Sequence, residues 1–140
     1  MGDMMSLMQR RREMMERELY PIGTDILTYF FGEESNRSKV GRMRHYVNIS
    51  TGEIKVHAGQ IAFEHYIPVK SSYRFRKENP NSGRSGVQFA CYDINKEYIY
   101  GWNSGGSWGD INLPKLPSDT AYIRLSYYFG NKGTRIIRIA

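Results

Sequence analysis

From Ile22 onward, apolar and polar residues alternate along much of the chain, which is the spacing of β-strands that bury one face. Residues 26–31 are also predicted to be a strand, 32–38 a polar loop, and 135–140 a last strand. The apolar positions that share a side of a predicted strand are Ile54 with Val56, the set Ile61, Phe63, Ile67 and Val69, Tyr73 with Phe75, and the set Ile123, Leu125, Tyr127 and Phe129. The chain is therefore expected to be rich in β-structure.

The clearest pattern is that of a β-hairpin. Apolar residues alternate along 87–91, aromatic residues alternate along 98–102, and a polar turn joins the two runs. A Gly- and Ser-rich loop at 101–110 follows and contains Trp102 and Trp108. Because such a loop cannot bury two large rings in regular structure, these rings are candidates for contact with a ligand or a partner.

Turn-forming residues separate the predicted strands. Runs that contain Gly, Pro, Asn or Ser stand at 50–52, 79–83, 113–117 and 131–133. About eight short strands with such turns and one consistent apolar face predict an all-β fold, a jelly-roll-like two-sheet β-sandwich. The sandwich is expected to be a single domain over 21–140, because a chain of 140 residues is too short for two ordinary domains.

Residues 4–19 carry the one convincing helical pattern, with strong helix formers and no Gly or Pro before Pro21. A helix of this length is marginal in water and must dock on something. It either packs on its own β-domain or anchors that domain to a partner, and crossing into a bundle with other copies is a third option. We assign residues 1–20 to a helical anchor segment. Its anchoring or oligomerisation side chains are expected to be Met5, Met8, Arg12, Met15 and Leu19.

The formal net charge of +6 belongs to the β part of the chain, because the charges within residues 1–19 cancel. The lysines and arginines of the β part stand singly, without the clustered stacking aromatics of a nucleic-acid surface, so no nucleic-acid partner is expected. A diffuse positive excess fits solvated strand faces first. It also fits an anionic glycan or an acidic neighbour in an assembly.

Cys91 is the only cysteine, so no intrachain disulfide or Cys-based metal site is expected. In step with Phe89, it is predicted to be a buried, inert thiol. Residues 4–8 are too short for the apolar part of a signal peptide, and the arginines that follow stand on the wrong side of it. No segment approaches membrane-spanning length. The protein is therefore expected to be made in a cytoplasm and not to insert into a membrane.

Few residues suggest catalysis. His45, His57 and His65 lack the spacing of a metal site, and His57 falls among outward, solvated positions. Asp93 and Asp119 fit turns. The acidic residues that could supply a carboxylate pair for glycoside hydrolysis are Asp93, Glu97, Asp110 and Asp119. No enzyme activity, cofactor or metal is expected. A glycoside-active enzyme is a third hypothesis, which ranks behind a binding protein and a structural protein.

Binding of a sugar is easier to build from the residues present. A pyranose offers an apolar face that stacks on aromatic rings and hydroxyls that pair with polar side chains. The residues that combine these properties in one short span are Tyr100, Trp102, Asn103, Trp108 and Asp110. The alternative is that one or both tryptophans fold back to cap an open end of the sandwich.

Four stretches carry a resemblance to a known family: YIPV at 66–69, YRF at 73–75, FACYDINKEYI at 89–99 and LPSDTAYIRLS at 116–126. Their order and spacing resemble the β-sandwich modules of bacteriophage tail, baseplate and fibre proteins, which are similar to carbohydrate-binding modules. The opening SLMQRRR, followed by two methionines, also resembles the start of small phage and prophage structural proteins.

The resemblance implies a virion accessory protein, attached to a phage head or tail through residues 1–20 and made in the host bacterial cytoplasm. It further implies a homo-oligomer whose sandwich faces outward and binds host cell-surface glycan weakly at many sites. The competing hypothesis is a purely structural capsid decoration or connector protein without a ligand. The double-tryptophan loop lies outside the shared pattern, so it is either a specificity loop or a contact with a neighbouring subunit.

Overall fold

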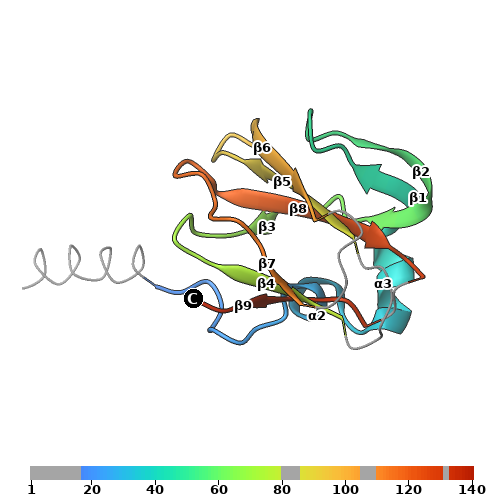
Figure 1. Cartoon of the computed structure of the whole chain (residues 1–140), viewed down its shortest axis with the longest axis horizontal. Helices are drawn as coiled ribbons and strands as arrows, with labels where there is room; N and C mark the ends of the chain where they lie inside the picture. The colour runs from blue at the N-terminus through green and yellow to red at the C-terminus, as the bar shows by residue number, and fades with distance from the viewer. Residues whose placement is uncertain (1–16, 80–85, 105–109, 131–132) are drawn as a thin grey trace, which may run out of the picture.

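Two antiparallel β-sheets form the fold in the computed structural model, which describes residues 17–79, 86–104, 110–130 and 133–140 (Figure 1). The described part of the chain is mostly β-structure with two short helices. The predicted all-β, two-sheet sandwich is therefore confirmed.

The larger sheet has six strands. They follow the order β1–β2–β8–β5–β6 across the sheet, and the short strand β3 also pairs with β8. The bounds of these strands are β1 (Arg42–Val47), β2 (Ile54–Ala62), β3 (Ile67–Pro68), β5 (Val87–Tyr92), β6 (Tyr98–Asn103) and β8 (Tyr122–Tyr128). The predicted hairpin is confirmed, since β5 and β6 pair along their whole length.

The smaller sheet has three strands in the order β7–β4–β9. The bounds of these strands are β4 (Phe75–Glu78), β7 (Ile111–Asn112) and β9 (Arg135–Arg138). The predicted last strand is therefore confirmed as β9, which pairs with β4 rather than with a strand of the larger sheet.

The main core is built from the apolar positions that alternation predicts. The buried members of the predicted sets are Ile61, Phe63, Ile67, Val69, Tyr73, Phe75, Ile123, Leu125 and Tyr127. Two predicted members do not follow the pattern, because Val56 is 77% exposed and Phe129 is 37% exposed.

Strand β5 is buried on both faces, because a hydrophobic core lies on each side of it. Its inward residues Phe89 and Cys91 belong to the main core. Its outward residues Ala90 and Tyr92 belong to a second, smaller core that also contains Val47. This second core forms because the turn between β1 and β2 lies over the outer face of the sheet, where the Tyr92 hydroxyl donates to a carbonyl of that turn.

The prediction of a strand at 26–31 is wrong, because this segment is the α-helix α2 (Ile26–Phe31). The Asp25 side chain caps the helix by accepting from the backbone N–H of Leu27, and Gly32 ends it with a φ of 80°. The apolar run itself fits either state, so the deciding signals were the aspartate before it and the glycine after it.

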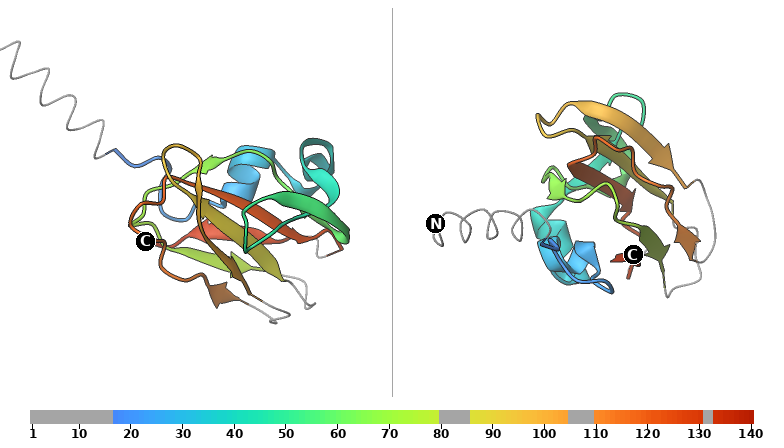
Figure 2. Two further views of the ribbon diagram at one scale, coloured as in Figure 1. Left: turned by 90° about the horizontal axis from the view of Figure 1, so that it is seen from above. Right: turned by 90° about the vertical axis from the view of Figure 1, so that its left-hand side faces the viewer.

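The prediction of a loop at 32–38 is wrong as well, because α3 (Glu34–Val40) occupies most of it. This helix is polar along most of its length and buries the single side chain of Arg37. Its stability comes from that tertiary anchor instead of an apolar stripe, so periodicity could not reveal it. Figure 2 shows both helices on one side of the sandwich.

Most of the predicted N-terminal helix lies outside the described residues, including Met5, Met8, Arg12 and Met15. Residues 17–19 are not helical, so the predicted helix does not extend to Leu19, which is 41% exposed. The described chain is tied to the sandwich from its first residues on: the Glu18 carboxylate lies 3.2 Å from Arg138, and the Leu19 N–H donates to the Tyr73 hydroxyl at 2.7 Å.

Within the described residues, no helix has the length and apolar character needed to cross a membrane.

Candidate functional site

Four tyrosines cluster on the outer face of the larger sheet, at the end near the β5–β6 turn. Tyr66 makes edge contacts with Tyr92 and Tyr122, with ring centroids 5.0 and 6.0 Å apart, and Tyr98 lies 6.5 Å from Tyr92. These rings complete the second core, and Tyr66, Tyr98 and Tyr122 stay partly exposed. The second core therefore opens to solvent on this side.

The Arg124 side chain holds the tyrosine cluster together from within. Its guanidinium carbon lies 4.4 Å from the ring centroid of Tyr66 and 4.9 Å from that of Tyr92. Its N–H groups donate to the Tyr92 hydroxyl at 3.0 Å and to the Gly52 carbonyl at 2.7 Å. Burial raises the pKa of Tyr92, and its hydroxyl donates to the Gly52 carbonyl. Arg124 thus has a structural role in the tyrosine cluster.

Lys96 is placed over the cluster by a tightly bonded turn. The Asp93 carboxylate accepts from the backbone N–H groups of Asn95 at 2.8 Å and Glu97 at 3.0 Å, and the Lys96 N–H donates to the Asp93 carbonyl. Lys96 has a φ of 62°, which is unusual for a residue with a Cβ. Its ammonium group lies 5.1 Å from the ring centroid of Tyr66, so the turn delivers a cation to the aromatic surface.

An open pocket of about 510 Å³ lies beside the cluster. Its lining residues are Phe30, His65, Tyr66, Pro68, Lys96 and Tyr122. Phe30 comes from α2, and its ring centroid lies 5.6 Å from that of His65. The pocket, called the Tyr66 pocket from here on, thus joins aromatic rings to two basic groups, and none of its lining residues carries a carboxylate.

The structure places three residues of the predicted tryptophan site, Tyr100, Trp102 and Asn103, on strand β6. The prediction that Trp102 stands in a loop is wrong, because β6 continues through Asn103 and Trp102 pairs with Phe89. The ring centroids of Trp102 and Phe89 lie 5.8 Å apart, so Trp102 is half-buried against the main core. Asn103 and Asp110 are exposed, and Trp108 lies outside the described residues.

Tyr100 packs partly on the main core, with its ring centroid 6.4 Å from that of Phe89. It also lines an open pocket of about 580 Å³, to which Ser71, Ser72 and Lys115 contribute. Tyr100 therefore remains accessible, but the aromatic partners of its predicted site do not line this pocket among the described residues.

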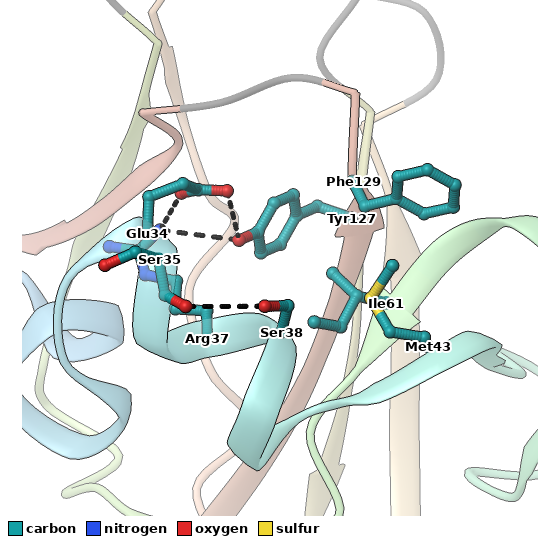
Figure 3. A pocket seen from close by; sticks show the side chains of 8 residues that line it. All are labelled: Glu34, Ser35, Arg37, Ser38, Met43, Ile61, Tyr127 and Phe129. Carbon is teal, nitrogen blue, oxygen red and sulfur yellow. Dashed lines mark hydrogen bonds and ion pairs between the residues drawn. The ribbon is translucent and has the colours of Figure 1, made fainter.

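A third pocket, of about 460 Å³, lies between α3 and the larger sheet (Figure 3). Its wall is mainly apolar, with Met43, Ile61 and Phe129 on the side of the sheet. At its polar end, the Tyr127 hydroxyl donates to the Glu34 carboxylate at 3.3 Å, and burial raises the pKa of Tyr127 to about 12.

The polar groups at this end of the third pocket stabilise the fold. The guanidinium of Arg37 is 3% exposed and links the two helices to the segment before β9. All five of its N–H donors have acceptors, as a buried guanidinium requires. The acceptors are Gly32 O at 3.1 Å, Glu34 Oε2 at 3.0 Å, Thr134 O at 2.7 Å, Asp25 Oδ2 at 3.4 Å and Thr28 Oγ1 at 3.1 Å. Arg37 therefore has no donor left for a ligand.

The other reactive side chains are dispersed or buried. Burial raises the pKa of the Cys91 thiol to about 12, as expected of an inert core thiol. His57 is half-buried between Tyr46 and Tyr128, not solvated as the sequence suggested. Over the ranges that the structure describes, no three His, Cys, Asp or Glu side chains come close enough to hold a metal ion.

The sequence did not single out the Tyr66 pocket. The available signal was that Tyr92, Tyr122 and Arg124 occupy the alternate positions of strands whose other positions form the main core. Aromatic residues on the supposedly solvated side of a strand indicate a second packing surface. The contribution of Phe30 could not be foreseen, because its segment was predicted to be a strand.

Comparison with known proteins finds no matching family model, no matching curated protein and no matching solved structure. The resemblance to phage β-sandwich modules therefore stays a prediction.

Proposed function

We propose that this protein is a binding module that takes a sugar ring of a glycan into the Tyr66 pocket. The observation that carries the proposal is the composition of this pocket: the rings of Phe30, Tyr66 and Tyr122 line one open cavity together with the donors of Lys96 and His65. The pocket is about 510 Å³, within the range of roughly 300–1,000 Å³ that is typical of small-ligand sites.

The chemistry of a sugar matches this lining. The C–H face of a pyranose packs on aromatic carbon, while its hydroxyls accept from ammonium and imidazole N–H groups. The Tyr66 pocket is held in shape before any ligand arrives, because Arg124 and the Asp93 turn fix its rings and its cation. Such pre-organisation reduces the entropy lost on binding.

We propose binding without catalysis. Hydrolysis of a glycosidic bond ordinarily needs two carboxyl groups across the scissile bond, and the lining of the pocket provides none. The nearby Asp93 carboxylate accepts from two backbone N–H groups of its own turn.

The wider setting of the proposal rests on the sequence resemblance. In that setting the protein is a phage virion accessory protein, held to the head or tail through residues 1–20, and many weak sites on an oligomer act together. A structural coat or connector protein without a ligand is the alternative. A result in which no glycan binds would favour it.

A glycan array probed with the full chain tests the proposal, with Tyr122→Ala as the site variant. Tyr128→Ala is the matched control, because Tyr128 ends the same strand and is exposed away from the pocket. We expect Tyr122→Ala to weaken binding by about tenfold or more, equivalent to about 1.4 kcal/mol, and Tyr128→Ala to leave it unchanged.

The exposed residue His65 offers a second site variant, His65→Ala, which keeps the test valid if Tyr122→Ala fails to fold. Binding that survives both site variants but is lost in Tyr100→Ala would move the site to the open pocket that Tyr100 lines. Binding to no glycan would refute the proposal.

A further inference from the structure

The Tyr66 pocket has a one-sided charge. The basic side chains of its wall are Lys96 and His65, and no lining residue is acidic. Across the described residues, no carboxylate lies within ion-pair distance of the Lys96 ammonium, although the aromatic rings hold it at the mouth of the pocket. A cation held in this way is available to an anion from outside.

The two cations of the tyrosine cluster differ in this respect. The Arg124 guanidinium lies beneath the rings and donates to the Gly52 carbonyl and the Tyr92 hydroxyl. Lys96 is exposed, and its backbone, not its ammonium group, makes the bonds of the turn. Arg124 therefore stabilises the scaffold, while Lys96 presents its charge to the solvent.

The backbone conformation of Lys96 also points to a role for its charged side chain. A φ of 62° favours glycine or asparagine over lysine, and the type of turn alone does not require a charged side chain there. The ammonium group that results lies 5.1 and 5.8 Å from two tyrosine rings. Contact with aromatic faces orients the cation at little cost in hydration, and an anion that reaches it forms a charge-assisted hydrogen bond.

From this geometry we propose that the Tyr66 pocket selects sugars that carry a negative charge, which pairs with the Lys96 ammonium. This inference rests on the proposed glycan binding and names the class of sugar. The shared chemistry is a sugar ring with one anionic substituent, either a carboxylate, as in a uronic acid, or a phosphate. A neutral sugar would make the same aromatic contacts and lack the charge pair.

The test measures dissociation constants for three probes on the full chain: glucuronic acid, glucose 1-phosphate and glucose. We expect the preferred anionic sugar to bind about tenfold or more tightly than glucose, and added salt to reduce this preference because the pair is exposed. The dissociation constants of glucuronic acid and glucose 1-phosphate show whether the pocket prefers a carboxylate or a phosphate. Equal affinity for the three probes would overturn the inference and leave the proposed sugar binding intact.

Charge variants complete the test. Lys96→Gln should abolish the preference for the anionic sugar over glucose, and Lys96→Arg should retain most of it. Lys115→Gln removes the same charge from the wall of the separate pocket that Tyr100 lines, and it should not change the preference for the anionic sugar. A preference that persists in Lys96→Gln would overturn the role of Lys96. A wild-type chain that binds none of the three probes, and no glycan on the array, would refute the proposed function itself.

Discussion

Gly101 in β6 lies directly against the backbone of Ile49, so that a Cβ atom on Gly101 would stand 2.0 Å from the Ile49 carbonyl oxygen. The hydroxyl of Tyr98, three residues earlier, donates to the same carbonyl. The turn between β1 and β2 therefore rests on the outer face of β6, and only a glycine permits this approach. This contact closes the second core, from which the Tyr66 pocket is built.

The variant Gly101→Ala should consequently be strongly destabilising. Because the obstructing atoms are backbone, which cannot rotate away, we expect a loss of about 3 kcal/mol or more in the free energy of unfolding. Urea unfolding followed by tryptophan fluorescence measures it. Gly130→Ala is the control, since a Cβ there meets nothing within 4 Å, and its effect should stay within about 0.5 kcal/mol. Equal stability of the two variants would show that the turn does not rest on β6.

Replacement of Arg37 tests the buried cross-link between the helices and the sheets. Arg37→Met removes five donors and leaves the Asp25 and Glu34 carboxylates without their cation. Loss of one partner of a buried ion pair costs about 3–5 kcal/mol, and denaturant unfolding should show this. The control is Arg42→Met, because Arg42 and Glu64 form an exposed pair that is worth at most about 1 kcal/mol. A loss for Arg37→Met no larger than that of the control would contradict the structural role.

Stability should fall at alkaline pH through Tyr127. The pKa of this tyrosine is 10.0 in a solvated chain and about 12 in the fold, mainly because of burial. Below about pH 10, both states keep the proton and the full contribution is present. Between about pH 10 and 12 the unfolded state loses its proton first, so the free energy of unfolding decreases as pH rises.

Tyr127→Phe isolates this effect, because the variant lacks the ionising group. The difference in unfolding free energy between wild type and Tyr127→Phe should narrow or reverse between about pH 10 and 12, by up to about 2–3 kcal/mol. A difference that stays constant across this range would mean that Tyr127 ionises equally in both states.

The Cys91 thiol should resist modification in the folded protein. Its side chain is fully buried and its pKa is raised to about 12, so the reactive thiolate is scarce near about pH 8. A thiol reagent such as DTNB should react slowly with the native chain and rapidly in denaturant. Rapid, stoichiometric labelling under native conditions would contradict the burial of β5.

Much of the β-architecture could be predicted from alternation, because a strand with one buried face leaves a regular mark on the sequence. Phe89 and Leu125 have this spacing and lie in the core as predicted. The helix at 26–31 was missed because a run of six residues that is apolar except for Thr28 fits a strand as well as a helix. The polar helix α3 was missed because its stability depends on Arg37, whose acceptors come from distant segments of the chain.

The candidate site was beyond what the sequence could predict. Trp102 drew attention as an aromatic beside a Gly-rich loop, but pairing with Phe89 places it on the main core. Phe30, Tyr66 and Tyr122 lie far apart in the sequence and converge only in the fold, where Phe30 of α2 meets His65 beside the tyrosines. Convergence of this kind depends on tertiary geometry, which a single sequence does not contain.

Amide chemical-shift mapping would locate a bound sugar in the Tyr66 pocket residue by residue. The full chain, labelled with ¹⁵N, is titrated with the glycan that binds best on the array. We expect shifts concentrated at His65, Tyr66, Lys96 and Tyr122, with Tyr100 and Trp102 unchanged. Shifts centred on Tyr100 and Trp102, or no shifts with any glycan, would contradict it.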